Sequence, residues 1–287
     1  MENLTFYKIL NSLDQSIKFK SQPIILNPTS NPSSLELKLD ITSICKKIYS
    51  SEEYRREIEN KPDVFPILIY SQLLQNLNVL CISDYPCKTL PDFPNLTHLL
   101  CYNTKLEILP NLPKIERLDS ERNHFKFIPE TWLNLKDLNC KYSSIDHNRG
   151  IPPNLIKITH LSFMYSTDNS DFLKIPETLI NIELLRITCT KAKIPSFLPA
   201  LNYLEVAESP NFDEISPMLT NLIGLVCTNT NVSIIPDTLV KLERLYIGNT
   251  RVREISRTLI NLQELYCSNT GIRSVPKELT KLKKIKR

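Results

Sequence analysis

Apolar residues recur at fixed offsets over residues 77–287. The stretches LLCYNTKLEILP, LVCTNTNVSIIP and LYCSNTGIRSVP share the frame LxxLx(C/I/L)xxTx(I/L/V)xx(I/L)P, which is followed by two or three polar residues and a further Leu. Neighbouring units lie 19 to 24 residues apart, and an eleventh, truncated unit begins at Leu282. The ten full units begin at Leu77, Leu96, Ile115, Leu135, Ile158, Ile182, Leu201, Leu222, Leu242 and Leu262.

Each unit predicts one short strand followed by one turn. Its first six residues place Leu at the fourth position and an apolar residue at the sixth, which is the two-residue alternation of a strand. Further apolar residues come at the eleventh and fourteenth positions. The Pro after them predicts an extended or single-turn segment, as in IPETL, IPDTL and VPKEL. Because a unit can bury its Leu side only against its neighbours, the pattern predicts a solenoid.

This frame and its short period resemble the leucine-rich repeat. The IP or LP step is similar to the compact repeats of bacterial effector-type proteins. The Asn-, Ile- and Lys-rich composition and the CxNT motif are similar to those of leucine-rich repeat proteins of large DNA viruses. The resemblance implies an α/β repeat fold, a curved solenoid with a parallel β-sheet on its concave face and short turns or 3-10 segments on its convex face.

Residues 1–76 do not follow the repeat, and we expect a small helical N-terminal cap there. MENLTFYKILNSLDQSI has helical apolar spacing, the Pro- and Ser-rich residues 21–34 indicate a loop, and residues 34–60 are expected to be helical. The apolar residues 64–77 would dock on the first coil. A cap shields the end of a solenoid. The alternative is a recruiting module, such as the F-box-like segment of a ubiquitin-ligase substrate receptor, but no convincing F-box signature is present.

The ninth position of a unit carries a short polar residue in nine units of ten. We expect these side chains to bond buried backbone groups where the chain turns off the strand. The resemblance implies Asn at this position, bonding between adjacent coils, and only Asn123 follows it, which leaves the bonding by Thr and Ser open. The residues are Thr104, Asn123, Ser143, Ser166, Thr190, Ser209, Thr230, Thr250 and Thr270, and Tyr85 breaks the pattern.

The even count of eight cysteines invites a disulfide or zinc interpretation, which their positions oppose. Cys101, Cys140, Cys227 and Cys267 all occupy the inward sixth position. Those two coils apart would lie roughly 10 Å from each other, beyond the ~7 Å limit for a disulfide. No CxxC occurs, so we expect core thiols and neither metal nor cofactor. The outward Cys81 and Cys189 are the better candidates for modification.

Reduced thiols favour a reducing compartment. The start of the chain has no basic run followed by an apolar core, so no signal peptide is predicted. No apolar run is long enough for a membrane span. We therefore expect an intracellular, cytoplasmic protein.

Composition argues against an enzyme. Only four glycines are present, and no GxGxxG, Walker-type loop or HExxH occurs. The four histidines have no nucleophile arrangement beside them. The net charge is +4, although residues 241–287 hold 12 basic and 4 acidic residues. We expect the C-terminal KELTKLKKIKR to be a charged cap that discourages edge pairing, and no nucleic-acid partner is predicted.

Six of the eleven tyrosines fall at outward strand positions, on the face expected to be concave. Tyr and Arg commonly anchor protein interfaces, although Tyr is also simply a good strand residue. We predict a non-enzymatic protein-interaction module, the alternatives being an adaptor that recruits through residues 1–76 or a structural component of a viral or cellular assembly. The predicted partner-binding residues are Tyr102, Arg117, Arg122, Tyr142, Tyr165, Arg186, Tyr203, Arg244, Tyr246 and Tyr266.

Overall fold

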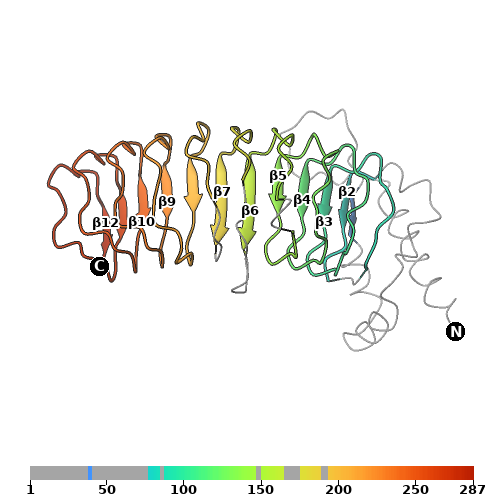
Figure 1. Cartoon of the computed structure of the whole chain (residues 1–287), viewed down its shortest axis with the longest axis horizontal. Coiled ribbons are helices and arrows are strands. Elements are labelled where there is room, and N and C mark those ends of the chain that lie inside the picture. Colours follow the sequence, from blue (N-terminus) through green and yellow to red (C-terminus); the bar gives the residue numbers. More distant parts are fainter. Residues whose placement is uncertain (1–37, 41–76, 85–86, 147–149, 165–174, 189–192) are drawn as a thin grey trace, which may run out of the picture. The chain divides into compact units, whose positions relative to one another are not determined.

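Short parallel strands form the regular structure of this protein. The computed structural model describes residues 38–40, 77–84, 87–146, 150–164, 175–188 and 193–287. The chain divides into two compact units, residues 1–134 and 135–287, which are described separately below. Figure 1 shows the strands of each unit side by side in chain order. Within the described ranges every regular element is a strand and none is a helix.

The strands follow the repeat frame. From β2 onwards, each strand begins two residues after the start of a predicted unit, so the sequence frame is confirmed. The first unit contains β1 (Lys38–Asp40), β2 (Val79–Cys81), β3 (His98–Leu100) and β4 (Arg117–Asp119). The second contains β5 (Asp137–Asn139), β6 (His160–Met164), β7 (Leu184–Thr188), β8 (Tyr203–Glu205), β9 (Gly224–Val226), β10 (Arg244–Tyr246), β11 (Glu264–Tyr266) and β12 (Lys284–Lys286).

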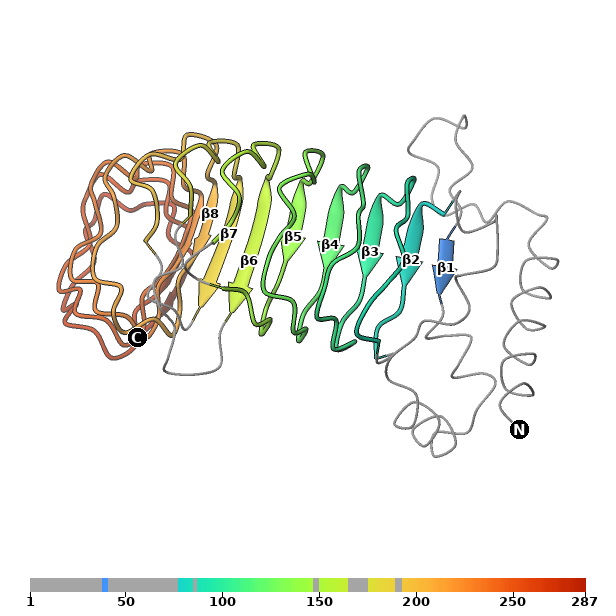
Figure 2. The ribbon, with the colours of Figure 1, turned by 45° about the vertical axis from the view of Figure 1, so that its right-hand side comes forward.

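The core of each unit is a row of leucines at the fourth position. In the second unit, Leu245 is in register with Leu225 on one side and Leu265 on the other. None of these three side chains exposes any surface. Burying one Leu side chain contributes about 1.5–3 kcal/mol, so every added coil extends the core. Figure 2 shows successive coils stacked along β2–β4.

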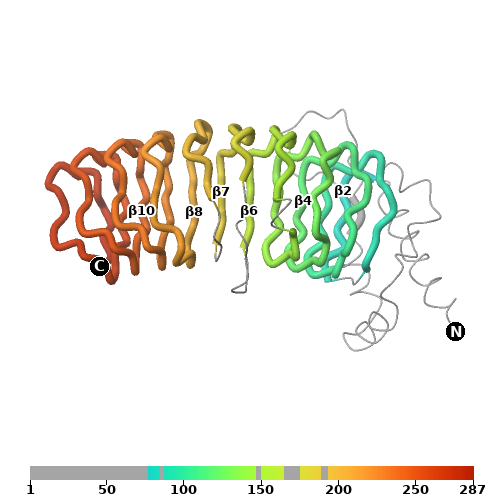
Figure 3. The backbone as a smooth tube through the Cα atoms, viewed as in Figure 1, coloured from blue at the N-terminus to red at the C-terminus, as the bar shows by residue number. Residues whose placement is uncertain are grey.

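The Pro step begins a single turn, as the sequence predicts. The Leu239 amide donates to the Pro236 carbonyl at 3.3 Å, and the Leu242 amide then donates to the Leu239 carbonyl at 3.1 Å. The same bond joins Leu279 to Pro276 at 3.2 Å. These isolated turns return the chain to the next strand without a helix, and the tube in Figure 3 traces this path coil by coil. The convex segments in the described residues are therefore turns.

The expectation of a helix over residues 34–60 is wrong at β1. Residues 38–40 are a strand, and Leu39 is in register with Leu80 of β2. The local sequence SLELKLDI explains the difference, because its apolar residues alternate with polar ones at the two-residue period of a strand. The rest of the expected cap lies outside the described residues. The helical cap and the domain boundary at residue 77 therefore stay predictions.

Side chains at the ninth position satisfy buried carbonyls in two ways. Thr230 and Thr250 donate to the carbonyls three residues earlier in their own coils, each at 2.7 Å. Asn123 Nδ2 donates to the Ser120 carbonyl of its own coil at 3.0 Å, and the side chain also reaches the preceding coil. Its Nδ2 donates to the Cys101 carbonyl at 2.6 Å, and its Oδ1 accepts from the Leu106 amide at 2.9 Å. Thr230 and Thr250 therefore support the turns of their own coils, whereas Asn123 also links two coils.

Replacing Asn123 should test this link. Asn123→Ala would leave buried backbone groups of two coils without partners, and we expect the free energy of unfolding to fall by about 2–4 kcal/mol. Asn123→Thr would keep the bond within its own coil and should cost less. Urea unfolding followed by circular dichroism measures both variants. Equal losses for the two would show that the bonds between coils contribute nothing.

Candidate functional site

The outer face of the sheet is formed by side chains that alternate with the buried leucines. In β10 the central Leu245 is buried, whereas Arg244 is exposed and Tyr246 is partly exposed. In β11 the neighbours of Leu265 are likewise partly exposed. Outward positions at the same place in neighbouring strands lie about 4.8 Å apart. Their side chains can therefore touch one another as well as a ligand.

Two predicted binding residues, Tyr246 and Tyr266, stack on each other. Their ring centroids lie 4.6 Å apart with an interplanar angle of 19°. The Tyr246 hydroxyl donates to Glu264 Oε2 at 2.8 Å. Lys284 Nζ lies 5.3 Å from the centroid of the Tyr266 ring and 3.8 Å from Glu264 Oε2. We call these four residues the tyrosine cluster.

Electrostatics hold the tyrosine cluster in one protonation state. The hydrogen bond to Glu264 raises the pKa of the Tyr246 hydroxyl above its ordinary value, and burial adds to the shift. The hydrogen bond with Tyr266, together with the Glu264 charge, raises the pKa of Lys284. Both groups therefore keep their protons at neutral pH. The cluster presents a protonated Tyr246 hydroxyl beside the Lys284 ammonium.

A second group joins Arg186, Tyr203 and Glu205. Arg186 Nε lies 3.2 Å from Glu205 Oε2, and the Tyr203 hydroxyl donates to the same oxygen at 3.3 Å. The Arg186 guanidinium lies 5.4 Å from the centroid of the Tyr203 ring. Burial, and then the Glu205 charge, raise the pKa of Tyr203. The polar groups of this cluster satisfy one another.

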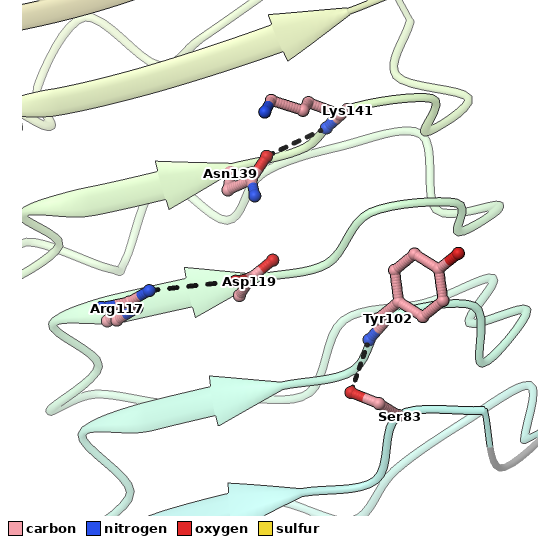
Figure 4. A network of polar contacts seen from close by, with 6 residues as sticks. All are labelled: Ser83, Tyr102, Arg117, Asp119, Asn139 and Lys141. Atoms are coloured by element: carbon pink, nitrogen blue, oxygen red, sulfur yellow. Dashed lines mark hydrogen bonds and ion pairs between the residues drawn. The ribbon is translucent and has the colours of Figure 1, made fainter.

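In the first unit, the predicted residues are paired with near neighbours. Arg117 forms an ion pair with Asp119 at 3.9 Å, and the Tyr102 amide donates to Ser83 Oγ at 3.2 Å (Figure 4). The Arg122 guanidinium lies 5.7 Å from the centroid of the Tyr102 ring. Arg117 lies within β4, whereas Tyr102 and Arg122 lie just beyond β3 and β4, where the chain turns. Nothing in the structure assigns these residues a ligand.

The remaining predicted residues differ in their settings. Arg244 is exposed and has no ion-pair partner among the described residues. Tyr142 lies just beyond β5, where the chain turns. Tyr165 lies outside the described residues.

The eighth position of the repeat adopts a left-handed backbone, which the alternation of the strand did not predict. Asn229 has a φ of 57° and Asn249 one of 56°, and the eighth position has a positive φ in every coil where it is described. Asn adopts this conformation at little cost, whereas other side chains are strained by it. The Asn of the CxNT motif was the sequence signal that could have predicted this left-handed backbone.

The asparagines at this position also form a ladder along the second unit. Asn269 Nδ2 donates to Asn249 Oδ1 at 2.8 Å, and Asn249 Nδ2 donates to Asn229 Oδ1 at 2.5 Å. Asn229 in turn donates to the Glu208 carboxylate. Each amide has a second hydrogen and a second lone pair. The ladder therefore keeps hydrogen-bonding capacity toward solvent.

Tyr142 should be strained at this position, since its φ is 55°. We expect Tyr142→Asn to raise the free energy of unfolding by about 1 kcal/mol, because Asn tolerates the left-handed region. The reverse change, Asn269→Tyr, should lower it by a similar amount. Thermal and urea unfolding measure both. A drop in stability for Tyr142→Asn would contradict the strain.

Comparison with known proteins supports the fold. No protein-family model matches the chain, and no characterised protein sequence matches it. An internalin (InlF) from Listeria monocytogenes matches with a TM-score of 0.54 and 14% identity, over 85% of this chain and 92% of that one. A chain of the octameric complex of Latrophilin 3, Unc5D and the leucine-rich repeats of FLRT2 matches with a TM-score of 0.53 and 17% identity, over 74% of each chain. The chain has the leucine-rich repeat fold.

A third match is similar in kind. A leucine-rich repeat protein of Leptospira interrogans has a TM-score of 0.45 and 16% identity, over 78% of this chain and 75% of that one. Identities this low establish the fold alone.

The sixth-position cysteines are core residues of the leucine-rich repeats. Cys101, Cys140 and Cys227 expose no surface, and Cys267 exposes 4%. None of these four cysteines forms a disulfide in the structure. Burial raises the pKa of the Cys227 thiol to about 12, and it does the same for Cys87. Such thiols are not nucleophiles at neutral pH. Cys81 is partly exposed, and Cys189 lies outside the described residues.

Thiol labelling of the native protein at pH 8 should separate these classes. We expect Cys81→Ser to remove one reacting thiol, because this side chain reaches solvent. Cys227→Ser should leave the native count unchanged and lower only the count in denaturant. A maleimide reagent with mass spectrometry measures both counts. Rapid native labelling of Cys227 would contradict its burial.

In the described part of the chain, no three His, Cys, Asp or Glu side chains are grouped to hold a metal ion. His98 and His160 each have Nδ1 close to the hydroxyl of the preceding Thr, at 2.9 Å and 3.0 Å. No helix in the described ranges is long and apolar enough to span a membrane.

Two lysines of the C-terminal region form hydrogen bonds to asparagines of the preceding coil. Lys241 Nζ donates to Asn221 Oδ1 at 2.6 Å, and Lys281 Nζ donates to Asn261 Oδ1 at 2.7 Å. Asn261 itself donates to the Val240 carbonyl at 2.8 Å. These lysines link neighbouring coils, and their bonds to neutral amides leave their positive charge in place.

Proposed function

We propose that the outer sheet face over β10–β12 binds a protein ligand. The tyrosine cluster carries this proposal, because two partly exposed aromatic rings are already stacked there and held by polar neighbours. Ordering side chains on binding costs roughly 0.5–1.5 kcal/mol each. Rings that are fixed in the free protein avoid part of that cost. Such a preorganised pair is well suited to anchor an interface.

The chemistry of this surface fits a protein better than a small molecule. Tyr and Arg dominate the energetically important residues of protein interfaces, and Tyr246, Tyr266 and Arg244 lie on two adjacent strands. Extended sheet faces are how solenoids commonly bind. The FLRT2 structure is a complex with Latrophilin 3 and Unc5D, which is consistent with a binding role for this fold.

A double variant, Tyr246→Ser with Tyr266→Ser, tests the proposal. Because two central aromatic anchors are removed, we expect the affinity for a captured protein partner to fall at least about a hundredfold. The purified full chain serves as bait in a cell lysate, and a partner identified by mass spectrometry is then titrated against each variant.

A matched control removes apolar surface elsewhere. Ile234, which is 73% exposed between β9 and β10, and Ile108, which is 65% exposed, are both replaced by Ser. This double variant should capture the same partner as the unchanged protein. A partner that binds the tyrosine variant undiminished would refute the outer face over β10–β12 as its site.

A further inference from the structure

Gly248 is a glycine that the fold does not need. Of the four glycines in the chain, Gly150 has a positive φ of 61°. A Cβ on Gly224 would lie 2.7 Å from the Tyr203 ring, and one on Gly271 would lie 2.8 Å from Arg253 Cγ. Gly248 has no positive φ, and its added Cβ would meet nothing closer than 3.5 Å. A Cβ would therefore make only ordinary contacts there.

Keeping glycine at such a place has a cost. Gly loses more backbone freedom on folding than Ala, by roughly 0.5–1 kcal/mol. Where neither conformation nor packing requires it, glycine often marks the close approach of a ligand or another backbone. Gly248 follows Tyr246 by two residues, and a Cβ added to it would lie 3.8 Å from the Thr228 methyl. The bare backbone therefore lies beside the tyrosine cluster.

Charge at the same strands is unbalanced. Arg244, Lys284 and Lys286 carry three positive charges on β10–β12, against the single carboxylate of Glu264. Glu264 already accepts from Tyr246 and pairs with Lys284. Arg244 is exposed with no ion-pair partner among the described residues. A ligand with carboxylates would complement this surface.

Hydrogen-bonding groups lie next to Gly248 as well. Asn249, the following residue, is exposed and uses one amide hydrogen on Asn229 and one lone pair on Asn269. Its remaining hydrogen and lone pair match the free N–H and C=O groups of an extended chain. A helix uses those groups internally. The ladder therefore favours an extended segment over a helical one.

We infer that the ligand segment is an acidic, extended peptide whose main chain crosses Gly248 beside the tyrosine cluster and whose carboxylate pairs with Arg244. This inference rests on the proposed function and specifies its partner. The bare Gly248 backbone admits the peptide main chain, the Asn249 amide bonds it, and the stacked rings of Tyr246 and Tyr266 pack against its side chains.

A library of random 12-residue peptides displayed on phage tests the inference against the full chain. We expect Asp and Glu to be enriched at least about twofold over the unselected library. Individual selected peptides, labelled with a fluorophore, are then titrated by anisotropy. Gly248→Leu should weaken them at least about tenfold by occupying the approach path, and Arg244→Gln should weaken them by removing the paired charge.

The fold of these variants is checked independently. Because the Cβ on Gly248 makes only ordinary contacts, Gly248→Leu should keep the circular dichroism spectrum and the melting temperature of the unchanged chain. Gly248→Ala should weaken binding less than Leu does. Ile234→Ser is the surface control and should leave the affinity unchanged.

The outcomes separate the two proposals. Selected peptides that lose affinity for the tyrosine double variant, yet bind Gly248→Leu and Arg244→Gln normally, would overturn this inference and leave the proposed function standing. Peptides indifferent to the tyrosine variant as well would count against both. A selection that yields no binders, or only basic ones, would also overturn the inference, while the protein partner captured from lysate tests the proposed function by itself.

Discussion

An inward leucine in one coil is buried against the inward residues of the neighbouring coils. The rows of fully buried side chains at Leu225, Leu245 and Leu265 show this dependence directly. A single coil with a three-residue strand has no core of its own, and its stability comes from its neighbours. The constraint fixes the register of adjacent strands. It leaves the outward positions free to vary, which is why chemistry concentrates on them.

The second constraint is that the backbone of every coil must turn away from its strand at the same position of the repeat. The eighth position meets it with a left-handed backbone and the ninth with a side chain that bonds a buried carbonyl. Asn suits the eighth position for conformational reasons. Stacking then brings each amide within reach of the next, so that Asn229, Asn249 and Asn269 form a ladder at the border of the outer face. A requirement of folding thus supplies hydrogen-bonding groups to the surface.

Much of this architecture was predictable because the period is so regular. Leu at the fourth position placed every strand from β2 to β11, the truncated unit at Leu282 placed β12, and Cys at the sixth was correctly assigned to the core. The failures have local causes. At β1 the alternating leucines stand in a charged stretch that also suits a helix, and only pairing with β2 decides between them. The left-handed turn was missed because two-residue alternation was extended beyond a strand that ends after three residues.

Contacts between outward side chains were harder to predict than their positions. The repeat places Tyr246 and Tyr266 at equivalent sites, but their stacking depends on Glu264 and Lys284 holding the rings.

Arg186 and Arg244 lie on the same face, but they differ in whether their charge is already paired. Arg186 is already paired with Glu205 and covers Tyr203, so a ligand there would have to displace an existing bond. Arg244 has no such pair among the described residues. A charge that is still solvated loses water on binding and gains a partner, whereas a paired one must first lose its partner. The surface beside Arg244 is therefore where a carboxylate gains most.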